Sequence, residues 1–453
     1  MQPRCTACAA LAAITLLALG GCADSSGPSA PASVVAAAGG GQVGPVNSLL
    51  PQPIVATVLD AAGQPVPGVQ VSWSAEAGGR ATAATNVTDA QGQAHARWVL
   101  GATAGPSRAT ATVAELEPAT FTAYAEPPDQ LPFGEVRPLV LPTYEGSRQV
   151  VHPDYVRVPD GAPQHGHHLA ITPYPFGNAA HENPSHFIGE RVDAFALPPD
   201  APNPVVRPGT GHLSDPDMLY LEAEGELWLY YRQVTGDNII LLTRTRDGLR
   251  WSPPVEVVRA PNHQVVSQTV VRRGEGDWWM WSVNAGVHGC SAPAATVEVR
   301  RSTDGIQWSA AERVGLEQQG LYPWHLEVQW VPSRSEFWAL YNVKRAGDCA
   351  TPALFLATSP DGVTWTVVSQ PVLTRGRIPE LADIVYRSTF QYDPVTDAVT
   401  FWYSGARHSE TGYVWGAAVE RRRREEIFTA LSGARRLGAD SWGEPPERLY
   451  EAP

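Results

Sequence analysis

Three copies of one short motif constrain the fold of this chain more than any other feature of the sequence. Residues 245–251 (TRDGLRW), 302–308 (STDGIQW) and 359–365 (SPDGVTW) place an Asp-Gly pair at an interval of 57 residues. An Asp-Gly pair favours a tight hairpin turn, and the Trp after it packs across the turn or against a neighbouring unit. A degraded copy lies one interval earlier, at residues 190–195, with Phe195 in place of Trp. This period predicts propeller blades, because one blade cannot bury both of its faces alone.

Two further strand types recur in phase with the motif. The expected innermost strands begin near residues 152, 214, 267, 325 and 387, and the expected second strands cover 169–174, 227–232, 278–284, 337–342 and 399–404. Five strands of each type predict a five-bladed β-propeller over residues 133–431, with 432–453 left as a C-terminal tail. The fifth blade lacks the Asp-Gly motif, as expected of the blade that closes the ring.

A separate group of short strands precedes the propeller, over residues 44–126. Runs with the period-two alternation of β-strands cover 53–59, 69–73, 94–100, 109–113 and 120–124. Turn-forming clusters at 60–65 and 89–92 divide them, and strands at this spacing predict a small sandwich. The predicted fold class is therefore all-β, a β-sandwich followed by a five-bladed β-propeller.

The sandwich segment is similar to a known module. Residues 58–73 (VLDAAGQPVPGVQVSW) and 88–101 (TDAQGQAHARWVLG) resemble the bacterial Ig-like group 1 domain of invasins and intimins. The resemblance implies an Ig-like fold that serves as a spacer or an adhesive stalk. No catalytic constellation is evident within it.

The first residues predict export. Arg4 precedes an uncharged apolar run over residues 5–19, which is too short to span a bilayer and is typical of a signal peptide over 1–21. The run ends in LGGC at 19–22 and resembles a bacterial lipobox, which implies acylation of Cys22; the alternative is an ordinary secretory peptide with a chance cysteine. Residues 22–43 are expected to form a flexible tether. The implied location is the cell envelope, held to the membrane by the lipid anchor, and Ala23 favours the outer membrane, at its periplasmic face or the cell surface.

Cysteine usage and charge limit the other expectations. Cys290 and Cys349 remain after export, and an oxidising compartment favours a disulfide between them. The net charge of -13 argues against nucleic acid as a partner. The run of arginines at 421–424 is flanked by Glu residues, which predicts a solvated, locally neutralised patch. The residues indicate no oligomeric state.

Side chains at the beginnings of the innermost strands should converge on the central channel. Carboxylates, a guanidinium and aromatic rings in one funnel suit a sugar, since carboxylates act as acid and base and aromatic rings stack on sugar faces. The expected binding residues are His152, Asp215, Glu182, Arg232, Trp324, His325, Arg387 and Arg407. The structural alternative is that the acidic residues cap backbone amides or neutralise buried cations.

The propeller resembles the five-bladed glycosidase superfamily, which includes family 43 arabinanases and xylosidases. By position, the resemblance implies that Asp154 is the base and that Asp217, or Asp215, tunes the pKa of the pair. The family's acid on the third blade has no counterpart, because residues 267–269 read Ser-Gln-Thr. Glu327 is the nearest substitute on the fourth blade, followed by Glu182.

No metal site is predicted from ligand spacing. The tract HGHH at 165–168 has the composition of a metal tract but opens a predicted strand, without spaced partners. Family relatives sometimes hold a calcium ion in the channel, and His325 would be its neighbour. The predicted function is a glycan-cleaving hydrolase in which Asp154, Asp217 and Glu327 are catalytic. The alternative is a non-catalytic adhesion or carbohydrate-binding lipoprotein.

Overall fold

The computed structural model describes residues 30–316, 321–368, 370–428 and 435–437. Cys22, the predicted signal peptide and most of the predicted tail therefore lie outside the described residues. The chain forms two compact units, Met1–Pro127 and Pro128–Pro453. No helix in the described ranges is long and apolar enough to cross a bilayer.

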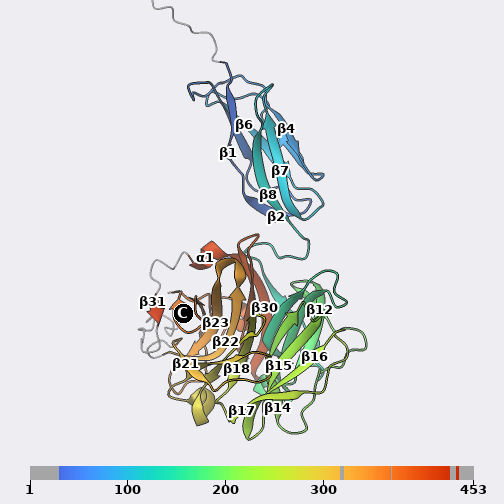
Figure 1. The fold of residues 1–453 in the computed structure, drawn as a ribbon, viewed down its shortest axis with the longest axis vertical. Coiled ribbons are helices and arrows are strands. Elements are labelled where there is room, and N and C mark those ends of the chain that lie inside the picture. Colours follow the sequence, from blue (N-terminus) through green and yellow to red (C-terminus); the bar gives the residue numbers. More distant parts are fainter. Residues whose placement is uncertain (1–29, 317–320, 369, 429–434, 438–453) are drawn as a thin grey trace, which may run out of the picture. The chain divides into compact units, whose positions relative to one another are not determined.

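The first unit is a sandwich of two four-stranded sheets (Figure 1). One sheet has the order β1 (Ser33–Ala38), β3 (Ile54–Leu59), β6 (Gln93–Val99), β5 (Arg80–Ala83). The other has the order β2 (Gln42–Pro45), β8 (Ala119–Glu126), β7 (Gly105–Thr112), β4 (Ser72–Ala75). Alternate residues of the strands face inward, and Trp98 and Phe121 are among the largest side chains of the core.

The predicted tether is wrong over its second half. Residues 33–38 form β1, which pairs antiparallel with β3, and residues 42–45 form β2, which pairs parallel with β8. Small Ala and Gly residues gave this segment the composition of a linker. Its strands are stabilised instead by backbone pairing to the sheet edges and by burial of Val34 in the sandwich core.

The second unit consists of five sheets, one for each blade (Figure 1). Blade one contains β10 (Val150–Val158), β11 (Gly166–Pro173), β12 (Ser185–Arg191) and β13 (Ala194–Ala196). Blade two contains β14 (His212–Leu221), β15 (Glu226–Val234), β16 (Asp237–Thr245) and β17 (Val255–Pro261). Blade three contains β18 (Val266–Gly274), β19 (Asp277–Asn284), β20 (Thr296–Ser302) and β21 (Glu312–Val314).

Blades four and five add short strands to the same plan. Blade four contains β22 (Tyr322–Val331), β23 (Glu336–Lys344), β24 (Ala353–Ser359) and β25 (Trp365–Val367); β26 (Leu373–Thr374) pairs with β24, and β31 (Arg435–Leu437) pairs with β25. In blade five, β27 (Ile384–Val385) and β28 (Thr389–Asp393) both pair with β29 (Ala398–Ser409), followed by β30 (Gly412–Arg423). β9 (Val136–Leu139), the first strand of the second unit, pairs with β30 as the last strand of this blade. This pairing closes the ring.

The repeated motif joins neighbouring blades. Its turn is held by its own side chains, as in blade three, where Ser302 Oγ and Asp304 Oδ1 accept backbone N–H groups. An aromatic side chain on the second strand of the preceding blade donates to the turn: Tyr230 to the Gly305 carbonyl at 2.8 Å and Trp281 to the Gly362 carbonyl at 2.9 Å. Gly305 has φ +74°, and a Cβ there would lie 2.8 Å from the Tyr230 hydroxyl. The motif therefore fixes the spacing between blades.

The degraded copy of the motif has the same role in ring closure. Trp402, on the second strand of blade five, donates to the Val192 carbonyl of blade one at 2.9 Å. Blade one thus receives a hydrogen bond from blade five as blades three and four do from their predecessors.

A β-bulge interrupts the innermost strands of several blades near the start. The pairing register shifts between Val151 and Asp154 in β10 and between Ser214 and Asp217 in β14. Within these bulges His152 and Asp215 have φ of 54° and 51°. Bulges re-aim side chains and concentrate near functional sites. Here they contribute His152 and Asp215 to the cluster described next.

Candidate functional site

A cavity of about 300 Å³ opens where the innermost strands begin, and all five blades contribute to it. We call it the mouth cavity. Its lining residues are His152, Tyr174, Ala179, Glu182, His212, Arg232, Val234, His263, Cys290, Trp324, Cys349, Ile384, Tyr386 and Trp415. The predicted residues His152, Glu182, Arg232 and Trp324 thus line the same cavity. His212, His263 and Tyr386 were not predicted, because no short motif marks them.

His152, Asp215 and His325 form a buried cluster at this cavity, which we call the upper layer. One ligand atom from each residue lies within 4.8 Å of the others. Asp215 Oδ1 is 3.5 Å from His152 Nε2 and 3.4 Å from His325 Nδ1. These three atoms are buried and have no hydrogen-bond partner among the described residues. Thr172 Oγ1 lies 2.9 Å from His152 Nδ1 and thereby orients the other ring nitrogen toward Asp215.

The protonation states of the upper layer suit a metal ion. Burial lowers the pKa of His152 to about 3 and lowers that of His325 well below its ordinary value, so both rings are neutral near pH 7. Burial alone would raise the pKa of Asp215, but the Arg232 guanidinium, with Nε 2.9 Å from Asp215 Oδ2, holds it below its usual range. Two neutral imidazoles and one carboxylate are a ligand set for divalent transition metals.

All three residues were predicted as substrate-binding residues of the channel, but no metal site was assigned to them. The one metal considered there was calcium beside His325, an ion that prefers oxygen ligands. The three residues come from blades one, two and four, and no local ligand spacing links them. The available signal was weaker: each lies two residues before one of the three predicted catalytic carboxylates.

Those carboxylates, Asp154, Asp217 and Glu327, form a second cluster in the channel, the lower layer. Their oxygens lie within 4.8 Å of one another, and the residues are only 2%, 2% and 4% exposed. Asp154 accepts the Met218 N–H at 2.5 Å, and Asp217 accepts the Val270 N–H at 3.0 Å.

Arg387 lies between the two layers. It is fully buried and places Nη2 3.4 Å from Glu327 and 3.7 Å from Asp217, with Nη1 3.9 Å from Asp215. The predicted binding residue Arg387 thus compensates buried acids.

Burial raises the pKa of each lower-layer carboxyl. For Asp154 the neighbouring charges of Glu327 and Asp217 add to burial, and for Asp217 the charge of Glu327 does so. Burial raises the pKa of Glu327 to about 7. The lower layer therefore retains protons at a pH where exposed carboxyls have lost them.

The lower layer reaches solvent at the other end of the channel. Asp217 and Glu327 line a second cavity of about 310 Å³ together with Tyr155, Arg157 and Trp330. The sequence analysis expected the carboxylates and the other binding residues to share one funnel. The structure divides them, because residues two apart on each innermost strand lie at different depths of the channel.

Glu182 is the carboxyl that lines the mouth cavity. Burial, followed by the charge of Asp215, raises its pKa well above the ordinary value, so it keeps its proton at a pH where an exposed glutamate has lost it. Its Oε2 lies 3.4 Å from His212 Nε2, and burial lowers the pKa of His212 to about 4. A protonated carboxyl and a neutral imidazole at one cavity wall are suited to proton transfer.

The remaining predictions have different outcomes. The predicted disulfide between Cys290 and Cys349 is confirmed. Arg407 is exposed near the end of β29 and is absent from the residues that line the mouth cavity, because β29 extends beyond the channel to Ser409. The arginine run is not uniformly solvated: Arg421 is buried and donates to Thr396 Oγ1 at 2.8 Å.

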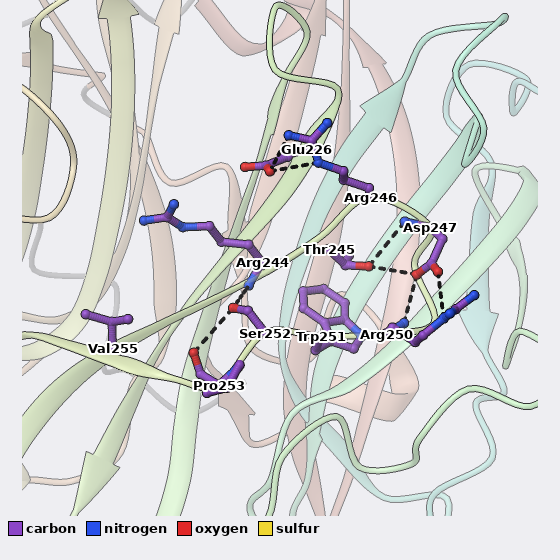
Figure 2. A pocket seen from close by; sticks show the side chains of 10 residues that line it. All are labelled: Glu226, Arg244, Thr245, Arg246, Asp247, Arg250, Trp251, Ser252, Pro253 and Val255. Atoms are coloured by element: carbon purple, nitrogen blue, oxygen red, sulfur yellow. Dashed lines mark hydrogen bonds and ion pairs between the residues drawn. The ribbon is translucent and has the colours of Figure 1, made fainter.

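A shallow cavity of about 760 Å³ follows the Asp-Gly motif of blade two (Figure 2). Arg246 pairs with Glu226 at 2.8 Å and Arg250 with Asp247 at 3.2 Å, while Arg244 lies 4.0 Å from the centroid of the Trp228 ring. Each cation of this surface turn thus has a partner within the protein.

Comparison with known proteins supports the fold of both units. The bacterial Ig-like domain (group 1) family matches residues 51–124. An A type blood N-acetyl-alpha-D-galactosamine deacetylase of Flavonifractor plautii is 29% identical over 308 residues. That alignment covers 56% of this chain and 40% of the relative, so the chain matches less than half of its length.

Solved structures lead to the same fold. An N-acetylgalactosamine deacetylase from F. plautii, in complex with blood group B trisaccharide, has a TM-score of 0.61 and 24% identity over 66% of this chain and 97% of its own. A GH62 hydrolase in complex with xylotriose has a TM-score of 0.46 and 14% identity over 62% and 94% of the two chains. The predicted resemblances are thus confirmed at the level of fold: residues 51–124 match the group 1 Ig-like family, and over 66% of the chain the fold is that of the solved deacetylase structure.

Proposed function

We propose that the propeller is a cation-dependent hydrolase that removes the acetyl group from an N-acetylated amino sugar of a glycan. The observation that carries this proposal is the upper layer: three buried, unpartnered ligand atoms of His152, Asp215 and His325 converge at a sugar-sized cavity. The deacetylase from F. plautii, which has the same fold, supports the choice of reaction.

The residues present fit a divalent transition metal. His152, Asp215 and His325 would hold it through two neutral nitrogens and one carboxylate oxygen. Such a cation, when bound, supplies Lewis-acid polarisation of a carbonyl and lowers the pKa of water. Arg232 keeps Asp215 ionised through their 2.9 Å ion pair, so that the carboxylate stays available as a ligand.

Glu182 can supply the proton that amide hydrolysis delivers to the departing amine nitrogen, because its raised pKa lets it keep a proton to a higher pH than an exposed carboxyl. Water adds its oxygen to the acetyl carbon as the C–N bond breaks, and the proton that the water loses restores Glu182. His212, 3.4 Å away, orients the carboxyl.

The cavity dimensions and aromatic residues favour a single sugar unit. A volume of about 300 Å³ is at the lower end of small-molecule sites. Tyr174, Trp324, Tyr386 and Trp415 line it, and aromatic rings provide apolar faces on which sugar rings stack. The proposed substrate is therefore a terminal amino sugar whose acetamide reaches the upper layer.

The second candidate function is glycoside hydrolysis by Asp154, Asp217 and Glu327. The observation in its favour is the close grouping of three carboxyls with raised pKa values. Against it, Asp154 and Asp217 accept backbone N–H groups, and Glu327 is compensated by Arg387. These partners explain the lower layer without a substrate.

The test compares the protein from residue 23 onward with two matched variants of it, Glu182→Gln and Glu327→Gln. Release of acetate and release of free sugar are both measured with glycans that end in N-acetylgalactosamine, with and without added Zn²⁺ or Mn²⁺. We expect cation-dependent acetate release that Glu182→Gln lowers by about 100-fold or more and that Glu327→Gln leaves nearly unchanged. Free sugar lost in Glu327→Gln would support the glycosidase instead, and binding without any product would support a recognition protein.

We also propose that the protein is anchored in the cell envelope through an acylated Cys22. The LGGC sequence at 19–22 supports this, and the disulfide is compatible with an exported protein. Expression of Cys22→Ala in a bacterial host should move the protein from the membrane fraction to the soluble fraction. Unchanged membrane association would contradict the anchor.

A further inference from the structure

We propose that the Cys290–Cys349 disulfide is part of the sugar-binding wall and determines how tightly the mouth cavity holds its substrate. This inference rests on the proposed function only for the class of ligand, an N-acetylated sugar. It assigns to the disulfide a role in ligand binding beyond joining two blades.

Both cysteines line the mouth cavity. Cys290 lies in the 3₁₀ segment η3 (Gly286–Ser291) between β19 and β20, and Cys349 lies in the loop between β23 and β24. These are equivalent loops of blades three and four. Cys349 is exposed and Cys290 is partly exposed, so the bond is accessible both to a bound ligand and to a reductant.

The blade-three loop is pressed against a second lining residue, His263. Gly289, next to Cys290, has φ +58°, and a Cβ there would lie 3.0 Å from the His263 ring. The backbone N–H of Ala285 donates to the His263 carbonyl at 2.9 Å. The position of His263 in the cavity wall is therefore coupled to the loop that the disulfide restrains.

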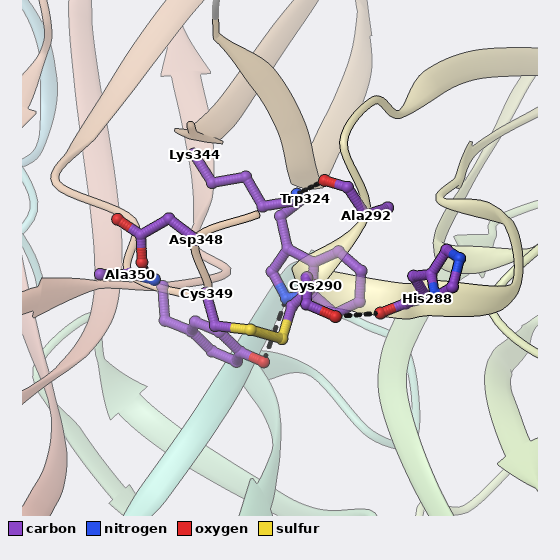
Figure 3. Close-up of a disulfide and its surroundings, with 10 residues drawn as sticks. His288, Cys290, Ala292, Trp324, Lys344, Asp348, Cys349 and Ala350 are labelled. Atoms are coloured by element: carbon purple, nitrogen blue, oxygen red, sulfur yellow. Dashed lines mark hydrogen bonds between the residues drawn. A yellow bond between two sulfur atoms is a disulfide. The ribbon is translucent and has the colours of Figure 1, made fainter. Parts of the chain in front are cut away.

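The disulfide also lies beside the aromatic part of the wall. Cys290 packs against the core cluster that contains Trp324, and Figure 3 shows the indole next to the disulfide. Trp324 Nε1 donates to the Tyr386 hydroxyl at 3.3 Å, which links the wall to blade five. A movement of the two loops would therefore shift the rings of Trp324 and Tyr386.

Other bonds hold the two loops together near the disulfide. Buried Lys344 donates from Nζ to the Ala292 carbonyl at 3.0 Å (Figure 3). The Gly347 N–H donates to the same oxygen at 3.2 Å. Reduction of the disulfide should therefore leave blades three and four folded, while the two loops that carry Cys290 and Cys349 become more mobile beside the cavity. The expected result is weaker sugar binding, because an ordered wall reduces the entropy lost on binding.

The first measurement is the rate at which tris(2-carboxyethyl)phosphine reduces the disulfide of the full soluble chain, with and without N-acetyl-D-galactosamine. We expect a saturating concentration of the sugar to slow reduction by about fivefold or more, since a ligand against the bond blocks the phosphine. A sugar that binds without changing the rate would overturn the inference, as would the absence of any sugar binding to the oxidised protein.

The second measurement is sugar affinity by calorimetry in the variant Cys290→Ala/Cys349→Ala. We expect Kd for the sugar to rise about tenfold while Kd for Zn²⁺ changes much less, because His152, Asp215 and His325 lie on innermost strands and not in these loops. Asp129→Asn, which weakens a contact to His167 in blade one, serves as the destabilised control and should leave both Kd values unchanged. An equal loss of sugar affinity in the control would mean a general structural effect and would overturn the inference.

The two proposals fail in different ways. If the sugar binds and protects the disulfide but no acetate is released, the proposed deacetylation is wrong and the proposed role of the disulfide in sugar binding is supported. If acetate is released but the sugar neither protects the disulfide nor loses affinity in the double variant, the proposed role of the disulfide is wrong and the proposed deacetylation is supported. The reduction assay uses the native disulfide and does not require the double variant to fold.

Discussion

The upper and lower layers of the channel come from the same three innermost strands, β10, β14 and β22. They differ in how many of their buried polar atoms have hydrogen-bond partners. His152 and Asp154 share β10, Asp215 and Asp217 share β14, and His325 and Glu327 share β22. The lower-layer carboxylates accept backbone N–H groups or face Arg387. The upper layer directs three unpartnered atoms toward one another.

A buried acidic cluster and a ligand site can be distinguished by whether the protein itself supplies partners for the buried polar atoms. Desolvating a carboxylate is costly unless hydrogen bonds and counter-charges compensate it. The lower layer meets that requirement within the protein. In the upper layer, Asp215 is compensated by Arg232, by Arg387 and by the Ser267 N–H. Its Oδ1 and the facing ring nitrogens of His152 and His325 still lack a hydrogen-bond partner among the described residues, and a cation is the partner that would complete them.

The largest expected effect is on stability and comes from the arginine between the layers. Arg387→Met leaves Asp215, Asp217 and Glu327 without their shared cation, which should lower the free energy of unfolding by about 3–5 kcal/mol. Urea unfolding measures the change. Arg407→Met, at an exposed position, is the matched control and should change stability by less than about 0.5 kcal/mol. Equal effects of the two substitutions would mean that the channel charges are not coupled through Arg387.

The next effect separates the layers by their affinity for a cation. Asp215→Asn removes the anionic ligand and should weaken Zn²⁺ binding by at least about 100-fold, whereas Asp217→Asn, two residues away, should change it by less than about threefold. Calorimetric titration of the folded proteins provides the comparison. A larger loss in Asp217→Asn would place the cation in the lower layer.

A smaller effect concerns pH. The pKa of Glu327 is about 7 in the folded protein against an ordinary value of 4.5, so the folded state binds more protons between these values. Its contribution to stability is therefore present below about pH 4.5 and is lost as the pH rises through 7. Glu327→Gln should remove about 2 kcal/mol of this dependence, since one pKa unit corresponds to about 1.4 kcal/mol and the neighbouring carboxyls share the proton. Urea unfolding of both proteins at pH 5 and pH 8 tests the sign of this pH dependence. An equal change in the free energy of unfolding between the two pH values, with and without Glu327→Gln, would refute the prediction.

The smallest effect concerns orientation within the upper layer. Thr172→Val removes the oxygen that lies 2.9 Å from His152 Nδ1 and should weaken Zn²⁺ binding by about tenfold. Thr269→Val makes the same change beside the lower layer, where Thr269 Oγ1 accepts the Val328 N–H, and should leave Zn²⁺ binding unchanged. Indistinguishable affinities of the two variants would mean that this contact does not orient the ligand.

Much of the fold followed from local patterns. The Asp-Gly turns at 57-residue intervals, with their recurring strands, predicted a five-bladed propeller, and the structure has five blades. The strands β1 and β2 were missed, because their Ala- and Gly-rich residues become strands only through pairing with β3 and β8.

The candidate site could be predicted only in part. The grouping of Asp154, Asp217 and Glu327 was expected from their equivalent positions on innermost strands, and the structure places them together. Their depth was not, since burial and the contact with Arg387 depend on how the blades close around the channel. His212 and Tyr386 carry no motif and enter the cavity only through the arrangement of five blades.

Local sequence patterns were enough to predict the number of blades, the Asp-Gly turns within them and the grouping of Asp154, Asp217 and Glu327. These follow from local turn chemistry and from the period-two alternation of strands, both of which act over a few residues. Only the tertiary structure decided which channel residues are neutral, which are ionised and which lack a partner. Those properties depend on desolvation and on charges from other blades, such as Arg232 beside Asp215 and Arg387 beside Glu327.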